Sequence, residues 1–488
     1  MIKFFWLLFP VAFIGYVALK CLYNIYLHPL RSYPGPLAAR ASVLPSQKNL
    51  LRGRLHLWTQ DLHRQYGPVV RLSPNELSFI DPDVWKDVYG HRASAFTKSL
   101  SSYGPDVHGN PPGILRAENA DHARQRKTVS HAFSDKALRE QEELLKSYVS
   151  LLVEKLQGIA AGQLQADLVQ WYNFTTFDIM ADLTFGESLN QLSDSGYHPW
   201  VWAVFSHIKL ISLSRVCREW PGLSELFQNL LPKDAKEKRR QHLEFSANML
   251  KKRMARETER PDIWTFVSRN AGQKGGLHAT ELNSNGAFFM LAGTETTATE
   301  LAGLTFMLLK NPDKMQRLTD EIRSSFNSTE DMNMSSLSRL QYLGACIEEG
   351  LRLYPPVPGG LARVTPQDGA SVCGRWIPGG TIVQAPIYSI HRSPTNFKDS
   401  DSFKPERFLA EGHDIYLSDR RDAMNPFSTG PRNCLGKNLA YHEMRLVMAS
   451  VLLHFDLELC DTTTDWLHQD MHLLWDKNPL MVKLRAVQ

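Results

Sequence analysis

The chain has 488 residues, of which 43% are hydrophobic and 22% are charged, a composition typical of a globular protein with a large core. Its 55 basic and 51 acidic residues give a net charge of +4, too balanced for a nucleic-acid-binding protein. The six cysteines form no Cys-x-x-Cys pair and lack zinc-finger spacing, so they indicate a reducing compartment and not a disulfide scaffold.

The first predicted element is a membrane-spanning helix close to the N-terminus. Residues 4–19 form an apolar run, and residues 21–23 extend it beyond Lys20, whose long side chain can reach the membrane surface. The positive charges that follow the run predict that the rest of the chain lies on the cytoplasmic side. A cleaved signal peptide is the alternative, but no pair of small residues ends the run. We therefore expect a membrane anchor with its exit segment over residues 1–33 and one large domain over residues 34–488.

The large domain is predicted to be mainly α-helical with a small β region. Helical spacing of apolar residues, or proline at a helix boundary, marks four ranges: 137–156, 236–257, 312–326 and 337–353. An unusually apolar helix is expected from Thr280, a candidate N-cap, to Leu309. Its length of roughly 45 Å and its apolar character on all sides predict a central, buried position. Residues 357–390 are rich in Val, Ile, Pro and Gly, which indicates short strands and turns.

The most specific motif of the chain surrounds a single cysteine. The sequence FSTGPRNCLG matches F-x-x-G-x-R-x-C-x-G at Phe427, Gly430, Arg432, Cys434 and Gly436. A chance match at all five positions has odds of about one in ten thousand. The glycines let backbone N–H groups approach the sulfur, and helix-forming residues after the cysteine place it near a helix N-terminus, where a thiolate is favoured. A thiolate is a suitable ligand for haem iron.

This motif resembles the cysteine-ligand loop of the cytochrome P450 superfamily, whose fold is mainly α with a small β region. The resemblance implies that the cofactor is haem b and that Cys434 is the axial ligand of its iron. Phe427, Gly430 and Gly436 would shape the loop around the cofactor. Residues 34–488 would then form one haem-binding catalytic domain.

Four basic residues resemble the side chains that contact the haem propionates in this family. Arg432 lies two residues before the cysteine. His122 and Arg126 are four residues apart in DHARQRK, so they lie on one face of a helix. Arg363 lies in PGGLARVTP. His122, Arg126 and Arg363, each taken alone, are also typical of ordinary surface residues, and it is their order along the chain that favours a shared site.

A second motif, AGTETT, lies within the predicted long helix. Four consecutive polar residues in a buried helix are costly unless they are hydrogen-bonded or functional. Hydroxyl groups bonded to carbonyls four residues earlier are the structural alternative. The motif resembles the family's oxygen-activation motif, in which Thr296 would hold a water molecule and Glu295 would relay protons. Many family members have aspartate where this chain has Glu295, and we expect the role to survive because both are carboxylates.

A third pattern, Glu-x-x-Arg, occurs at Glu349 and Arg352. The spacing is weak evidence alone, because Glu237 and Arg240 share it. In the family, however, such a pair joins a later arginine, here Arg407, in a buried structural triad. We therefore expect these three side chains to stabilise the fold and not to be catalytic.

The resemblance implies a monooxygenase that inserts one oxygen atom from O2 into a lipophilic small molecule. The sequence YNIYLHPLRSYPGP is similar to microsomal fungal enzymes of secondary metabolism, of the trichothecene (isotrichodermin C-15) hydroxylase type. The expected substrate is therefore a terpenoid or polyketide-like biosynthetic intermediate. The expected location is the endoplasmic reticulum membrane, with a single-pass anchor and a cytoplasmic catalytic domain.

The expected electron donor is NADPH, acting through a separate cytochrome P450 reductase, because the chain has no Gly-x-Gly-x-x-Gly motif of its own. Cytochrome b5 is a second candidate donor, and no nucleic-acid partner is expected. Six basic residues are candidates for a docking face: Arg124, Lys127, Arg420, Arg421, Lys437 and Arg445. Two other functions stay open. One is a haem-thiolate isomerase or dehydratase that needs no reductase, and the other is a non-catalytic membrane haem protein.

Overall fold

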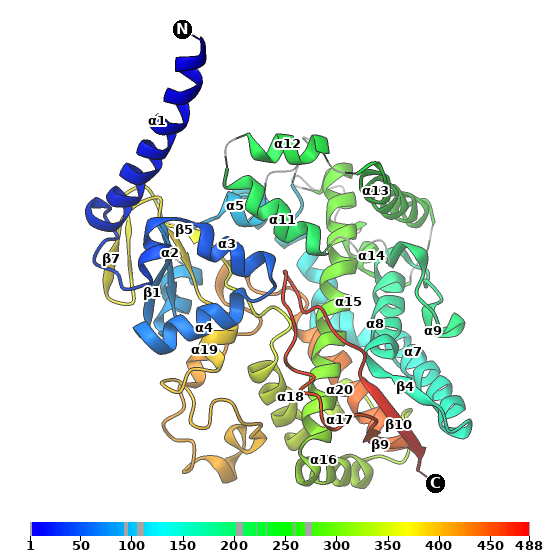
Figure 1. Cartoon of the computed structure of the whole chain (residues 1–488). Helices are drawn as coiled ribbons and strands as arrows, with labels where there is room; N and C mark the ends of the chain where they lie inside the picture. The colour runs from blue at the N-terminus through cyan, green and yellow to red at the C-terminus, as the bar shows by residue number, and fades with distance from the viewer. Residues whose placement is uncertain are drawn as a thin grey trace.

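The computed structural model describes residues 2–487 except 92–95, 105–111, 202–207, 221, 231, 257, 259 and 269–275. The described helices, in chain order, are α1 (Ile2–Leu22), α2 (Leu37–Ala41), α3 (Leu44–Leu51), α4 (Leu55–Tyr66), α5 (Leu100–Tyr103), α6 (Asn119–Val129), α7 (Asp135–Ala161), α8 (Leu168–Phe185), α9 (Gln191–Asp194), α11 (Ile208–Arg218), α12 (Leu223–Leu230), α13 (Lys233–Met254), α14 (Ile263–Ser268), α15 (Ala279–Leu309), α16 (Pro312–Ser325), α17 (Met334–Leu337), α18 (Gln341–Leu353), α19 (Ile387–His391) and α20 (Lys437–His454). Helices surround α15, as Figure 1 shows, and the predicted mainly α fold is confirmed.

The strands are short and form three small sheets. They are β1 (Val69–Ser73), β2 (Glu76–Phe79), β3 (Thr97–Lys98), β4 (Gln165–Asp167), β5 (Arg363–Val364), β6 (Ala370–Val372), β7 (Arg375–Ile377), β8 (Ile382–Gln384), β9 (Phe455–Leu459) and β10 (Met481–Ala486). The largest sheet has the order β1-β2-β8-β5-β3, in which only β2 and β8 are parallel. The second sheet has the order β4-β10-β9, so the C-terminal strand β10 pairs with β4, which directly precedes α8. The third sheet is the pair β6 and β7.

Helix α15 crosses the interior of the protein, as its apolar sequence predicts. It packs along α8, and the side chains of residues 298–308 are buried almost without interruption. The helix starts one residue before the predicted N-cap Thr280. His278 occupies the cap position, and its backbone N–H donates to Glu281 Oε2 at 2.9 Å. This bond satisfies a backbone donor at the start of the helix, which explains where α15 begins.

The other predicted helices are found with small differences in their ends. α7 covers the predicted range 137–156, whereas α13 ends at Met254 and so stops short of the predicted end at residue 257. α16 covers all but the last residue of 312–326. The helix predicted from residue 337 is interrupted, because α17 ends at Leu337 and α18 begins at Gln341. Strands β5 to β8 lie in the range predicted to contain strands.

The N-terminal segment forms helix α1, but the predicted membrane-spanning helix is not supported. Among the residues that the structure describes, no helix is both long enough and apolar enough to cross a membrane. The apolar run in the sequence has 16 residues, fewer than the roughly 20 that a membrane-spanning helix requires.

Candidate active site around Cys434

The loop that carries Cys434 is fixed by its own backbone. It runs from a 3-10 turn at Gly430–Arg432 to helix α20, whose N-cap is Gly436. The N–H of Cys434 donates to the carbonyl of Phe427 at 2.9 Å and closes the loop. The phenyl ring of Phe427 packs on Tyr441 of α20, with ring centres 5.2 Å apart. The predicted position of the cysteine beside a helix N-terminus is therefore confirmed.

The surroundings of the sulfur contain donors suited to an anion. Burial raises the pKa of the Cys434 thiol, although part of the residue is exposed. A hydrogen bond from the backbone N–H of Gly436 and the positive charges of Arg126 and Lys437 act in the opposite direction. These groups would therefore stabilise the thiolate when a metal cation replaces the thiol proton.

The two glycines of the loop have different roles. Gly430 has a φ of +70°, and a Cβ atom there would lie 2.0 Å from the carbonyl oxygen of Tyr89. Close packing on the segment around Tyr89 therefore requires this glycine, and its predicted role in the approach to the sulfur stays a prediction. A Cβ atom at Gly436 would meet nothing within 4 Å, and this residue contributes its N–H group.

Positive side chains gather beside this loop. Arg126 of α6 donates to the carbonyl of Asn433 at 2.7 Å, directly before the cysteine. Arg432 donates through Nη2 to the carbonyl of Ala117 at 2.7 Å, whereas its buried Nη1 has no partner among the described residues. Within the described part of the chain, no carboxylate forms an ion pair with Arg126, Arg432 or Arg363.

The pKa values show that these groups are close enough to affect one another. Burial and then the charges of Arg432, Lys98, Arg126 and Arg363 lower the pKa of His122 to about 3. His122 is therefore neutral at neutral pH. The structure thus brings together all four basic residues that the sequence predicted for one site.

Lys98 of β3 is a member of this group that the sequence did not reveal. Burial, followed by the charges of Arg363 and Arg432, lowers its pKa to about 6. Its side-chain nitrogen donates to the carbonyl of Leu115 and lies 4.5 Å from the ring centre of Tyr103. The Tyr103 hydroxyl accepts a bond from Arg363 at 3.2 Å. No local sequence pattern marks Lys98, and only the pairing of β3 with β5 places it beside Arg363.

This set of donors fits haem b. The group carries an iron, for which the Cys434 sulfur is a suitable ligand, and two carboxylates, which suit an unpaired cluster of positive charge. The buried, partnerless Nη1 of Arg432 is a donor that such a carboxylate would satisfy. The side chains that would hold the carboxylates are Lys98, His122, Arg126, Arg363 and Arg432.

Comparison with known proteins decides the family. Residues 34–484 match the sequence model of the family described as Cytochrome P450. The chain belongs to this family. Cytochrome P450 monooxygenase efuB of Hormonema carpetanum is 44% identical over 481 residues, which are 97% of this chain and 95% of that protein. Monooxygenase lcsI of Purpureocillium lilacinum is 44% identical (97% and 92% covered), and FUM2 of Gibberella moniliformis is 42% identical (95% and 99% covered). This P450 is therefore a monooxygenase, as the sequence predicted.

The polar motif of the P450 lies on α15, where its hydroxyl groups bond within the helix. Thr296 donates to the carbonyl of Ala292 at 2.6 Å, and Thr294 donates to that of Met290 at the same distance. These are the bonds of the structural alternative considered from the sequence. They leave the oxygen of Thr296 free to accept a further bond, so the bonds do not oppose a role in oxygen activation.

Among the described side chains, Glu295 and Thr296 form no hydrogen bond with each other. Glu295 forms a buried ion pair with Lys477, which lies between β9 and β10 and which the sequence did not suggest. Lys477 also donates to Thr299 Oγ1 at 2.7 Å. Burial raises the pKa of Glu295, whereas Lys477 lowers it.

The structural triad predicted for this P450 is present. Glu349 lies 2.7 Å from Arg352 Nε and 3.0 Å from Arg407 Nε, and all three side chains are buried. Arg407 also pairs with Asp419. Arg352 donates to three backbone carbonyls, those of His391, Ser400 and Ser402. The triad therefore holds the segment around residues 391–419 against α18.

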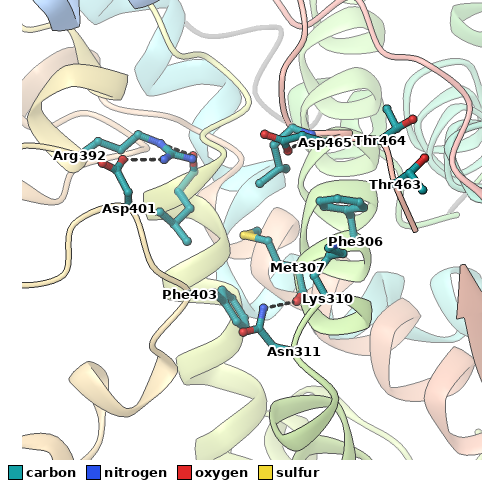
Figure 2. Close-up of a pocket in the computed structure, with 12 residues that line it drawn as sticks. Phe306, Met307, Lys310, Asn311, Arg392, Asp401, Phe403, Thr463, Thr464 and Asp465 are labelled. Atoms are coloured by element: carbon teal, nitrogen blue, oxygen red, sulfur yellow. Dashed lines mark hydrogen bonds and ion pairs between the residues drawn. The ribbon is translucent and has the colours of Figure 1, made fainter. Parts of the chain in front are cut away.

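A separate hollow of about 260 Å³ lies near the C-terminal end of α15. Figure 2 shows two of its polar side chains, Arg392 and Asn311, engaged with their neighbours. Arg392 lies 2.8 Å from Asp401, and Asn311 donates to the carbonyl of Met307 at 2.7 Å. None of the residues predicted for the active site of this P450 lines this hollow.

Proposed function

We propose that this P450 binds haem b through Cys434 and inserts one oxygen atom from O2 into a lipophilic small molecule. The observation that carries the proposal is the Cys434 sulfur, with the Gly436 N–H beside it and an unpaired cluster of basic side chains next to it. Thiolate-bound haem iron supplies the chemistry that splits the O–O bond. The chain contributes the sulfur, the side chains that hold the carboxylates, and the hydroxyl and carboxyl groups of Thr296 and Glu295 for proton transfer.

We propose a biosynthetic intermediate of secondary metabolism, terpenoid or polyketide-like, as the substrate. The support is the similarity to fungal P450 monooxygenases along almost the whole chain and the resemblance of the N-terminal sequence to microsomal members. The proposed electron source is NADPH through a cytochrome P450 reductase, with cytochrome b5 as a second donor.

We further propose that residues 1–33 attach the catalytic domain, residues 34–488, to the cytoplasmic face of the endoplasmic reticulum membrane. Apolar side chains of α1 support this proposal, because Val11, Ile14 and Leu19 are exposed to more than half of their possible extent. Exposed apolar side chains grouped on one helix are suited to contact with lipid.

Absorption of the reduced, haem-loaded protein under carbon monoxide tests the ligand. The expected result is the red-shifted band typical of thiolate-bound haem, and Cys434→Ser should lose it. The expected turnover needs NADPH and reductase. Product formed without NADPH would indicate the isomerase or dehydratase instead. Bound haem without substrate-dependent NADPH use would indicate the non-catalytic haem protein.

The role of Thr296 is tested by its alanine variant. Thr296→Ala should lower product formed per NADPH by on the order of tenfold or more, because the active site loses the hydroxyl group that would take part in proton transfer. Thr294→Ala is the matched control, since Thr294 makes the same bond to a carbonyl but is fully buried. Equal coupling in the Thr296→Ala variant and the parent would remove Thr296 from the mechanism.

A further inference from the structure

Residues 112–117, which we call the strap, connect the first turns of α15 to the cluster of basic side chains in the candidate active site. We propose that Asn285 and Gln125, which hold the first half of the strap, are positioning residues for Arg432 and Lys98. Both act through the backbone of the strap, whose second half bonds to these two donors. The inference rests on the proposed function, in which Arg432 and Lys98 hold the haem carboxylates.

Two buried amide side chains, which we call the amide clamp, hold the first half of the strap. The N–H of Ile114 donates to Asn285 Oδ1 at 2.7 Å, and Gln125 Nε2 donates to the carbonyl of Pro112 at 2.9 Å. Asn285 Nδ2 donates to Gln125 Oε1 at 3.1 Å, so the two amides also hold each other. Both side chains are fully buried, and removing either one would leave buried polar groups without a partner. The clamp therefore opposes any movement of the strap away from α15.

The amide clamp is itself fixed by two helices. Gln125 lies on α6 and Asn285 lies on α15. Gln125 Nε2 also donates to Glu281 Oε1 at 3.2 Å, and the Glu281 carboxylate accepts two bonds from Arg124. These bonds set the rotation of the Gln125 amide. Support of this kind, on helices and through a further layer of hydrogen bonds, is what keeps binding groups in a precise position.

The strap lies directly against α15 at Gly113. A Cβ atom there would lie 2.8 Å from Asn285 Oδ1 and 3.0 Å from Ser284 Cβ. The backbone N–H groups of Arg116 and Ala117 both donate to the carbonyl of Gly113 at 2.9 Å. This turn fixes the position of Ala117 relative to the point where the strap contacts α15.

The second half of the strap supplies acceptors for the basic cluster. Arg432 Nη2 donates to the carbonyl of Ala117 at 2.7 Å, and Lys98 Nζ donates to the carbonyl of Leu115. Arg432 Nη1 is buried and has no partner among the described residues. The strap therefore fixes one side of the guanidinium group and leaves a donor on the other side for a carboxylate.

The proposal separates two ways in which the chain would hold haem. Donors that are already fixed lose less conformational freedom when an anion binds, so a loose strap should weaken the hold on the carboxylates. The loop of Cys434 is closed by its own bond to the carbonyl of Phe427 and makes no use of the strap. A change in the amide clamp should therefore affect how long haem stays bound, but not the sulfur ligand.

Transfer of haem from the loaded full-length protein to excess apomyoglobin measures the rate of haem loss. Asn285→Leu should raise this rate on the order of tenfold, with the carbon monoxide band unchanged. Gly113→Ala should raise it too, because the new Cβ pushes the strap away from α15. Thr305→Val is the matched control, since it removes a buried bond of α15 to Tyr172, 20 residues and roughly 30 Å from Asn285. It should lower the stability of the fold and leave the rate of haem loss unchanged.

A double-mutant cycle tests whether the effect passes through the strap. In an Arg432→Met background, Asn285→Leu should raise the rate by about threefold or less, because only Lys98 is left for the strap to position. The same fold-change in both backgrounds, or an equal effect of Thr305→Val, would overturn the inference and mean that the clamp only supports the fold. A parent protein that lacked the thiolate band under carbon monoxide would instead contradict the proposed function and, with it, this inference.

Discussion

At the scale of single residues, the cluster beside Cys434 combines several positive charges with burial. Burial first, and then the charges of neighbouring arginines, lower the pKa of Lys98 to about 6 and that of Arg432 to about 10. A native protein tolerates such an arrangement when a bound anion compensates it. The carboxylates of haem b, the cofactor proposed for this chain, would be such anions.

Lys98→Met gives the first prediction at this scale. Above about pH 6, Lys98 of the haem-free protein is neutral, so haem binding must first supply it with a proton. The advantage of the parent over Lys98→Met in haem affinity should therefore decrease as the pH rises above 6. Below that pH, Lys98 is already charged and the advantage should be largest, about tenfold. Haem titrations of both proteins over the pH range measure this ratio, and a ratio that increased with pH would contradict the assignment.

The sequence predicted those site residues whose contacts are made with residues close to them in the sequence. Cys434 and its loop could be predicted because the hydrogen bonds and packing involve residues 427–441. Lys98 and Lys477 could not be predicted, because their partners come from strands and helices that are remote in the sequence. The position of Glu295 on the long helix was predicted, but its ion pair with Lys477 was not.

At the scale of elements, the cysteine loop has one strict backbone requirement. Gly430 adopts a left-handed conformation and lies against the backbone of Tyr89. A side chain there would be strained by its φ and would also collide with a backbone atom that cannot rotate away. Gly436, six residues later, has neither restriction.

The two glycine-to-alanine variants should therefore differ. Gly430→Ala should destabilise the fold by about 2–4 kcal/mol and reduce haem binding, because the loop must move to relieve the contact with Tyr89. Gly436→Ala should keep both stability and haem content close to those of the parent, because its Cβ meets open space and its N–H is retained. Chemical unfolding and haem quantification compare the variants. Equal effects at both positions would show that the contact is not the cause.

The triad offers a comparison between two identical sequence patterns. Glu349→Gln should lower the free energy of unfolding by about 3–5 kcal/mol, because it leaves two buried arginines short of their counter-charge. Glu237→Gln is the matched control, since Glu237 pairs with Arg240 at the same spacing on the exposed helix α13, and it should have little effect. Denaturant titrations measure both. A small change in Glu349→Gln would mean that the triad can be replaced by hydrogen bonds alone.

Helix ends were predicted less well than helices, and α18 shows the reason. The backbone N–H groups of Tyr342 and Leu343 donate to the two carboxylate oxygens of Glu321, both at 2.8 Å. Glu321 belongs to α16, so the start of α18 is set by a neighbouring helix. The local sequence, in which the apolar pattern continues back to Leu337, contains no sign of this contact.

At the scale of the whole molecule, the chain places its cysteine loop and its polar helix motif on elements that pack together. Helix α20, which begins after Cys434, packs against α15 in the main core. The order of the cysteine loop and the polar motif along the chain supported the family resemblance. Hydrophobic patterns predicted the helices but not how they pack together. The pairing of strands such as β2 with β8, which are distant in the sequence, had no local signal.

We propose that the electron donor docks on the surface next to the cysteine loop. Of the six basic residues predicted for this surface, two are already engaged within the protein. Arg124 pairs with Asp121 and Glu281, and Arg421 donates to the carbonyl of Arg407, so both are engaged internally. Lys437 is exposed at the start of α20, and no described carboxylate forms an ion pair with it. Its charge is therefore available to an acidic partner.

Lys437→Glu should slow reduction by the reductase on the order of tenfold at low salt, and the dependence of that rate on salt should weaken. Because Lys437 also lowers the pKa of Cys434, reduction by dithionite and the carbon monoxide band must be compared in the same variant. Both should match the parent if the defect lies in docking. Arg485→Glu, on the exposed face of β10, is the matched control and should leave the rate unchanged. If dithionite reduction slowed equally in Lys437→Glu, the effect would lie in the iron ligand and not in the docking surface.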